Sequence, residues 1–303
     1  MHISMHIRVV FVIVVCSLLL DLKDIQAEDI MKHTMIPTRG MTRADIYVVA
    51  PTSNPVAILL LAPGCNGDCR YLVSDAVWNE YAKSNRLALV GLSFASNTED
   101  IHSGKGYYYA SCGSGTVLLD AVDRIFGKKL PLLLYGFSGG AHFVARFSEW
   151  KPDRVIGWCA YSAGWWDIPN ASRISPPGIV VCGEDDERLG ASLAYFKQGR
   201  AIGKPWLWIE VKDNGHSQSK KVDSFVRNYY SLLLKDCALS TEKGIWIDID
   251  SLSFATSDLK NNYPCNTGWL PSESLFETLR DLYPTNQVLP KKVFVDMRAK
   301  LKP

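Results

Sequence analysis

Short apolar runs alternate with longer amphipathic stretches between residue 45 and residue 234. This alternation predicts a mostly parallel sheet covered by helices on both faces, which is the α/β class. The predicted strands span residues 45–49, 56–61, 88–92, 130–135, 155–161, 179–182 and 207–211. The predicted helices span residues 71–84, 114–126, 139–149, 189–202 and 219–234. Several strands are apolar throughout, which is typical of strands buried on both faces.

The N-terminus has the pattern of a signal peptide. Arg8 precedes an apolar run over residues 9–20, and a polar stretch ends at Ala27. The run is shorter than the ~20 residues that span a bilayer, so an uncleaved anchor is the weaker alternative. We therefore expect residues 1–27 to be removed and the mature protein to be secreted or periplasmic.

The pattern changes again in the last part of the chain. Residues 245–249 alternate like a strand, and Pro271 opens a predicted helix. These features predict a main domain over residues 28–236 and a C-terminal extension over residues 237–303 that packs on it.

Composition narrows the range of partners. The chain has 303 residues and is 47% apolar, enough for a full-sized core. Its formal charge is +2, and residues 1–27 carry two basic and two acidic side chains, so their removal leaves the charge unchanged. Such a balance gives no indication of a nucleic-acid partner or, after signal cleavage, of a membrane partner.

Seven cysteines remain after the predicted cleavage. In an exported protein, Cys237 and Cys265 are the favoured disulfide pair, because they bracket the C-terminal segment. Cys159 and Cys182 lie in apolar runs and are expected to be buried free thiols. The spacing of Cys65 and Cys69 lacks a second Cys/His pair downstream, so neither a metal nor another cofactor is expected.

The segment Gly136-Phe137-Ser138-Gly139-Gly140 carries the main chemical signal. It follows a buried strand and precedes a helix, and its glycines permit a sharp turn that exposes the serine side chain. In that context Ser138 is the predicted nucleophile. The alternative is a tight turn with an inert serine.

A serine nucleophile needs a base, and four histidines remain after the predicted cleavage. His216 follows the last predicted strand on a loop and is the best candidate. His142 lies one helical turn after Ser138 and is expected to be a surface or packing residue. A carboxylate must orient the base, and residues 184–187 supply four acids on one loop.

The order serine, acid, histidine on successive strand ends resembles the α/β-hydrolase superfamily. The resemblance implies Asp186 as the acid, with Asp185 as the alternative. It also implies an oxyanion hole made by the backbone N–H groups of Gly139 and Cys65. The superfamily's histidine before the second donor is absent here, since Pro63 occupies its position.

Within the superfamily the chain is most similar to secreted polyhydroxyalkanoate depolymerases and feruloyl esterases. The similarity depends on the segments at residues 61–65, 136–141 and 161–165. Only residues 163–177 separate the two predicted strands 155–161 and 179–182 that follow Ser138. A large helical insertion that covers the site, a cap, cannot fit there. An open site of this kind favours a bulky or polymeric ester.

Aromatic side chains gather near the predicted mouth of the site. Trp165, Trp166 and Tyr108 are the candidate substrate-binding residues, although packing under the loops is an alternative for each. The leading hypothesis is a serine hydrolase that cleaves a carboxylic ester. A peptidase or acyltransferase would use the same triad, and a non-catalytic binding protein on the same fold is the third hypothesis.

Overall fold

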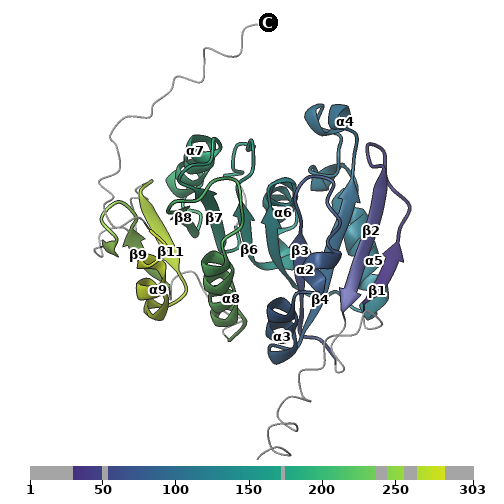
Figure 1. The fold of residues 1–303 in the computed structure, drawn as a ribbon, viewed down its shortest axis with the longest axis horizontal. Helices are drawn as coiled ribbons and strands as arrows, with labels where there is room; N and C mark the ends of the chain where they lie inside the picture. Colours follow the sequence, from purple (N-terminus) through teal and green to yellow (C-terminus); the bar gives the residue numbers. More distant parts are fainter. Residues whose placement is uncertain (1–29, 50–53, 172–174, 236–243, 256–264, 284–303) are drawn as a thin grey trace, which may run out of the picture.

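The structure, a computed structural model, describes residues 30–49, 54–171, 175–235, 244–255 and 265–283. Its centre is an eight-stranded sheet with the order β1-β2-β4-β3-β5-β6-β7-β8 (Figure 1). Its strands are β1 (Met31–Thr34), β2 (Arg43–Val49), β3 (Ala57–Ala62), β4 (Leu87–Ala95), β5 (Leu132–Phe137), β6 (Val155–Tyr161), β7 (Gly178–Gly183) and β8 (Trp206–Val211). The pairs from β4 to β8 are parallel, whereas β2 pairs antiparallel with β1 and β4. The predicted α/β class is confirmed.

Helices flank this sheet. They are α2 (Arg70–Val73), α3 (Ala76–Ser84), α4 (Thr98–His102), α5 (Ser114–Phe126), α6 (Gly139–Trp150), α7 (Leu189–Ala201) and α8 (Lys220–Lys235), with short 3₁₀ turns η2 (Ala110–Cys112) and η3 (Pro152–Arg154). α3 lies against α8, where Ser231 Oγ is 3.4 Å from the Tyr81 hydroxyl. α5 lies against α6, because a Cβ on Gly115 would be only 2.3 Å from the Trp150 ring.

Every predicted strand of the main sheet is present, and no strand end moves by more than three residues. The predicted helix over residues 71–84 is wrong in one respect, because it is split into α2 and α3. Asp75 causes the split: its extended backbone stops α2, and its carboxylate accepts hydrogen bonds from Val77 N (2.9 Å) and Trp78 N (3.0 Å). Strand β1 was not predicted, since its side chains are mostly exposed and show no apolar periodicity.

The parallel strands bring four loops to one edge of the sheet. Gly136 of β5 pairs with Ala160 of β6, and Tyr161 pairs with Val181 of β7. Gly183 then pairs with Val211 of β8. The carboxyl ends of β5 to β8 are therefore aligned, and ligands of open α/β sheets bind at such an edge.

The C-terminal part forms a second, three-stranded sheet with the order β10-β9-β11. Its elements are β9 (Ile245–Asp248), β10 (Ser253–Phe254), β11 (Thr267–Leu270), η5 (Glu273–Leu275) and α9 (Phe276–Arg280). The strand expected over residues 245–249 is β9. The helix expected after Pro271 is present as the short pair η5 and α9.

Contacts join this second sheet to the main domain. The buried Arg200 of α7 donates to the carbonyl of Thr267 (2.7 Å) and to its Oγ1 (3.1 Å), and its guanidinium lies 4.0 Å from the centre of the Trp246 ring. The Tyr283 hydroxyl donates to the carbonyl of Trp208. The same buried apolar cluster includes residues of both sheets.

The expected signal peptide over residues 1–27 lies outside the described residues. Within the described ranges, no helix is long and apolar enough to cross a membrane. The expected disulfide is unsupported: Cys265 is a free thiol, and Cys237 lies outside the described residues. Cys159 and Cys182 are fully buried free thiols, as predicted.

Candidate functional site

Ser138 lies at the turn between β5 and α6. Its backbone has φ 52° and ψ −112°, a region that L-residues seldom occupy and that costs about 1–3 kcal/mol. Its N–H donates to the carbonyl of Tyr161 at 2.8 Å, which ties the turn to the end of β6. The strained turn presents the serine oxygen at the carboxyl edge of the sheet.

The flanking glycines are required by close backbone contacts. A Cβ on Gly136 would lie 2.3 Å from the carbonyl oxygen of Gly140, and a Cβ on Gly140 would lie 2.1 Å from that of Ala62. Both distances are far below contact distance. The pattern predicted a sharp turn, and the structure shows that no larger residue fits at either position.

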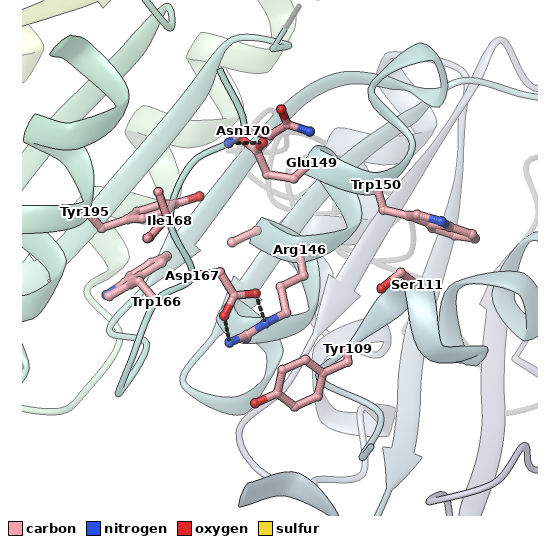
Figure 2. Close-up of a pocket in the computed structure, with 11 residues that line it drawn as sticks. Tyr109, Ser111, Arg146, Glu149, Trp150, Trp166, Asp167, Ile168, Asn170 and Tyr195 are labelled. Atoms are coloured by element: carbon pink, nitrogen blue, oxygen red, sulfur yellow. Dashed lines mark hydrogen bonds and ion pairs between the residues drawn. The ribbon is translucent and has the colours of Figure 1, made fainter. Parts of the chain in front are cut away.

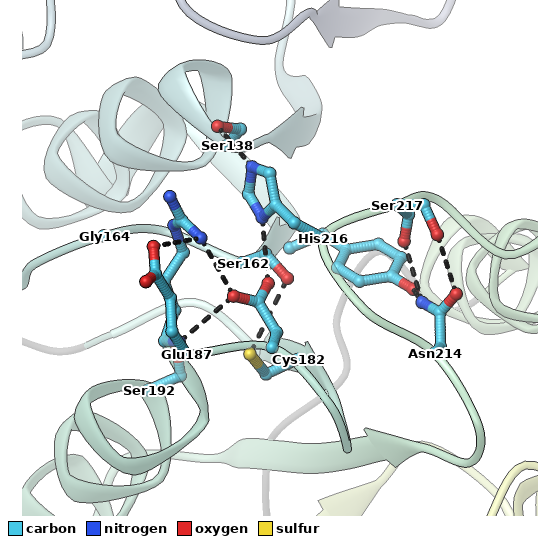
Figure 3. Close-up of polar contacts among 12 residues, drawn as sticks. Ser138, Ser162, Gly164, Cys182, Glu187, Ser192, Asn214, His216 and Ser217 are labelled. Carbon is cyan, nitrogen blue, oxygen red and sulfur yellow. Dashed lines mark hydrogen bonds and ion pairs between the residues drawn. The ribbon is translucent and has the colours of Figure 1, made fainter.

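Ser138, His216 and Asp186 form one continuous hydrogen-bonded chain. Figure 3 shows the His216 ring pointing toward Ser138. His216 Nε2 is 3.0 Å from Ser138 Oγ, and His216 Nδ1 is 2.8 Å from Asp186 Oδ2. The three residues come from the loops after β5, β7 and β8. The arrangement fits a histidine that takes the serine proton while a carboxylate orients the ring.

Asp186 is 5% exposed, and both oxygens of its carboxylate have hydrogen-bond partners. Its Oδ1 accepts hydrogen bonds from the backbone N–H and from Nη1 of Arg188, both at 3.0 Å. Burial raises the pKa of this carboxyl, but hydrogen bonds from His216 and Arg188 outweigh burial and lower the pKa to about 2. Asp186 is therefore ionised over the whole range in which an imidazole titrates.

The structure distinguishes between the two candidate acids. Asp185 is exposed, and its backbone N–H donates to the carbonyl of Asn214 at 3.0 Å, so that this segment fixes the histidine loop. The Asn214 amide in turn donates to the Tyr161 hydroxyl at 2.8 Å. Asp186, and not Asp185, has its carboxylate against His216.

Ser162 belongs to the same network and was not predicted. It is fully buried, has φ 57°, and its hydroxyl hydrogen-bonds Asp186 and lies 3.6 Å from Cys182 Sγ. Its place directly after the buried strand β6, at the carboxyl edge, is the sequence signal that would have identified it.

Two backbone N–H groups lie side by side near Ser138. A Cβ on Gly139 would be 2.6 Å from Cys65 N, so the backbone segments that carry the two predicted oxyanion donors lie in close contact. Neither N–H has a hydrogen-bond partner among the described residues. Two neighbouring backbone donors without a partner among the described residues suit a developing oxyanion.

The loop that carries Cys65 is held in place without the superfamily's histidine. The Asn66 amide donates to the carbonyl of Ser96 and accepts from its N–H, both at 3.0 Å. Arg43 Nη2 donates to the carbonyls of Asn66 (2.6 Å) and Gly67 (2.8 Å). These contacts fix the backbone of the loop, so Pro63 can replace the histidine.

The predicted substrate-binding residues have different positions. Tyr108 is only 4% exposed, and its ring stacks on His142 at 4.6 Å, so the ring has no open face for a ligand. Only its hydroxyl approaches the site, beside Gly139. Trp165 is half-buried and packs on His142 at 4.1 Å, on the rim of the site.

His142 is excluded as the base by its contacts. Its Nε2 accepts from Gly164 N at 3.0 Å, and its Nδ1 is 3.1 Å from Arg146 Nη1. Burial lowers the pKa of His142 well below its ordinary value, and the charges of Arg146 and Arg188 act in the same direction. It is a neutral packing residue, and buried rather than exposed.

Trp166 faces away from Ser138. It stacks on Tyr195 of α7 at 4.2 Å and donates to Ser192 Oγ at 3.3 Å. It lines a separate hollow of about 260 Å³, and Ser138 is not among the residues around that hollow. Among the described residues, no group of three His, Cys, Asp or Glu side chains could hold a metal ion.

The structure is similar to several solved hydrolases, whereas no known family model and no curated protein matches the chain. A ferulic acid esterase superposes with a TM-score of 0.51 at 15% identity, over 68% of this chain and 96% of that chain. LpqC, a poly(3-hydroxybutyrate) depolymerase from Bordetella parapertussis, gives 0.51 at 13% identity, over 69% and 90%.

A hyperthermophilic esterase from the archaeon Pyrobaculum calidifontis gives a TM-score of 0.52 at 13% identity, over 70% of this chain and 86% of that chain. Identities this low compare folds, and the fold is common to all three. The chain therefore adopts the α/β-hydrolase fold, which it shares with these three solved structures.

Proposed function

We propose that this chain is an exported serine hydrolase that cleaves a carboxylic ester through an acyl-enzyme on Ser138. The observation that carries the proposal is the unbroken chain from Asp186 through His216 to Ser138. Next to it lie two backbone donors that have no partner in the described part of the chain. The similarity to solved esterases supports the reaction class.

The first half of the reaction forms the acyl-enzyme. Ser138 Oγ bonds to the carbonyl carbon of the ester while its proton passes to His216 Nε2. The carbonyl oxygen becomes an oxyanion that the N–H groups of Cys65 and Gly139 receive. When the carbon–oxygen bond to the alcohol breaks, His216 returns the proton to the departing alkoxide.

The second half releases the acid. A water molecule attacks the acyl carbon and gives its proton to His216, which then protonates Ser138 Oγ as the acyl–serine bond breaks. The Asp186 carboxylate stabilises the imidazolium in both halves. These steps use the ester, water and the residues named above, and no cofactor.

Exposure of the site favours a bulky or polymeric ester. Side-chain exposure of His216 is 32%, and no helix or strand is described between β6 and β7 that would cover Ser138. A small substrate would be enclosed poorly here. A feruloyl or other acyl group on a polymer can reach the serine with the rest of the polymer outside.

Labelling by a fluorophosphonate tests the nucleophile. We expect the wild-type protein to be labelled and Ser138→Ala to be unlabelled, with Ser84→Ala, an exposed serine on α3, labelled like wild type. Labelling that persists in Ser138→Ala, or no labelling of the wild type, would refute the proposal.

A substrate panel separates ester hydrolysis from the other uses of the triad. Purified protein is given p-nitrophenyl esters, feruloylated and acetylated polysaccharides, poly(3-hydroxybutyrate) and peptide amides, with and without an alcohol acceptor. We expect the highest kcat/KM on an ester, with water as acceptor. A preference for the amides or for transfer to the alcohol would replace the esterase assignment.

Export is a separate part of the proposal, supported by the charge and apolar pattern of residues 1–27. Expression of the full chain in a secreting host, followed by intact mass of the extracellular protein, tests it. The expected N-terminus is Glu28. Retention in the membrane with an uncleaved N-terminus would contradict it.

A further inference from the structure

The hollow lined by Trp166, called the groove below, is separate from Ser138 and has features of a binding site that the proposed reaction does not use. Its volume is about 260 Å³, and it lies along α6 between the segment before α5 and the loop after β6 (Figure 2). Pockets for drug-sized ligands have about 300–1,000 Å³, so this groove suits one ring of a larger molecule.

Two chain segments lead from the triad to this groove. Tyr108 and Trp165 pack around His142 close to Ser138, whereas the next residues along the chain, Tyr109 and Trp166, line the groove. Along α6, Arg146 is two turns beyond Ser138, a distance of about 12 Å at 1.5 Å per residue. One extended ligand can therefore contact both places.

Aromatic rings form much of the lining, and Tyr109, Trp150 and Trp166 each pack against another group of the protein. Trp166 is stacked on Tyr195, and the Arg146 guanidinium lies 4.4 Å from the centre of the Tyr109 ring. Trp150 lies across the groove (Figure 2). The three rings are half-buried, which holds each of them in a fixed orientation.

The charges of the groove are paired within the protein. Arg146 Nε and Nη2 donate to the two carboxylate oxygens of Asp167 at 2.8 and 2.9 Å. Glu149 Oε1 is 2.7 Å from the Nζ of the buried Lys204, and its Oε2 accepts from Asn170 N at 3.1 Å. The lining of the groove therefore has planar hydrogen-bond donors and acceptors. Because their charges are paired, the groove attracts neither an anion nor a cation strongly.

We propose that this groove binds a neutral sugar ring of a polysaccharide whose ester lies at Ser138. Pyranose rings present apolar faces to aromatic side chains and hydroxyl groups to paired donors and acceptors such as Arg146 and Asp167. Among the described residues that line the groove, Arg146 is already paired with Asp167, so an anionic sugar finds no unpaired cation there. A purely aromatic ligand would make no use of the exposed Asp167 carboxylate, which can still accept hydrogen bonds from hydroxyl groups. The inference rests on the proposed function for the position of the ester only.

Binding to Ser138→Ala, which removes turnover, tests the site. The probes are xylotetraose, cellotetraose and mannotetraose, with tetragalacturonic acid and ferulic acid for comparison, measured by calorimetry. We expect saturable binding of at least one neutral tetrasaccharide, weakened roughly three- to tenfold by Trp150→Ala and by Asp167→Asn added to Ser138→Ala.

Matched controls keep the test decisive. Tyr71→Ala removes an exposed aromatic ring on α2, away from the groove, and is expected to leave the Kd of the tetrasaccharide unchanged. Asp167→Asn keeps the shape of an exposed side chain, so it remains informative if Trp150→Ala lowers Tm. Preference for tetragalacturonic acid or ferulic acid, no saturation by any neutral tetrasaccharide up to about 10 mM, or a Kd unchanged in both groove variants would overturn the inference.

Failure of this inference differs from failure of the proposed function. Fluorophosphonate labelling of the wild type without sugar binding removes the groove site alone. Sugar binding that depends on Trp150 and Asp167, without labelling at Ser138, leaves a carbohydrate-binding protein on the same fold.

Discussion

At the scale of single residues, neighbouring side chains of the same type acquire different roles from their surroundings. Asp185 and Asp186 are adjacent in the chain, yet one is exposed and the other is buried against His216. The same contrast separates Tyr108, which is buried under Trp165, from Tyr109, which lines the groove. Which member of such a pair carries chemistry depends on the direction of its side chain.

The two acids give a matched test of the triad. Asp186→Asn is expected to lower kcat for p-nitrophenyl ester hydrolysis roughly 10³–10⁴-fold, because an amide no longer holds the imidazole in the tautomer that accepts the serine proton. Asp185→Asn is expected to change kcat less than about twofold, as for surface substitutions. Equal effects of the two variants would remove Asp186 from the triad.

Stability in acid should report the same carboxylate. The pKa of Asp186 is about 2, against an ordinary value of 3.8, so this carboxylate binds its proton at a lower pH in the folded state than in the unfolded state. Its stabilisation of about 2 kcal/mol is complete above pH 4 and is lost as the pH falls through 2. Urea unfolding of wild type and Asp186→Asn should give free energies of unfolding that approach each other by about that amount between pH 5 and pH 2. A gap independent of pH would contradict the assignment.

At the scale of elements, the strand–turn–helix from β5 to α6 is determined by backbone contact. Gly140 lies against the carbonyl of Ala62 at the end of β3, and Gly136 lies against Gly140 itself. The strained φ of Ser138 is possible because α6 and the neighbouring strands hold the turn on both sides.

A glycine exchange tests this close approach. Gly140→Ala is expected to lower the free energy of unfolding by roughly 2–4 kcal/mol, since the methyl group must displace backbone. Gly190→Ala, in α7 with nothing within 4 Å of the new Cβ, is expected to stabilise by about 0.5–1 kcal/mol through a lower helix cost. Chemical denaturation of both variants is the measurement, and a neutral Gly140→Ala would show that the turn can relax.

At the scale of the whole molecule, the two sheets share one buried cluster. Arg200 of α7 is 1% exposed and binds Thr267 of β11, while Tyr283 hydrogen-bonds the backbone of β8. The described part of the second sheet therefore lies against the β8 side of the main sheet.

Cooperative unfolding should follow from that arrangement. Arg200→Met is expected to cost roughly 2–4 kcal/mol, because it removes the buried hydrogen bonds that Arg200 donates to the carbonyls of Thr267 and Lys204. Lys197→Met, on the partly exposed side of the same helix, is expected to change stability by less than about 0.5 kcal/mol. Calorimetry should show one transition for wild type. Two separate transitions would mean that the extension folds independently.

The sequence by itself determined the class of the fold and singled out Ser138 and His216, while it left the acid open between Asp186 and Asp185. Buried parallel strands need continuous apolar runs, and these runs are legible without coordinates. The glycines around Ser138 could also be recognised in the sequence, because a sharp turn between a strand and a helix requires them. The position of His216 could be recognised because it directly follows the last predicted strand of the main sheet.

Tertiary structure decided what depends on the direction of side chains. It separated Asp186 from Asp185, added Ser162, buried Tyr108 and turned Trp166 into a groove away from Ser138. It also split the predicted helix at Asp75, where a side-chain cap competes with helical periodicity. The cap at Asp75 is a local contact, whereas contacts between residues far apart in the chain set all the others, and local patterns of apolar and polar residues carry no record of those.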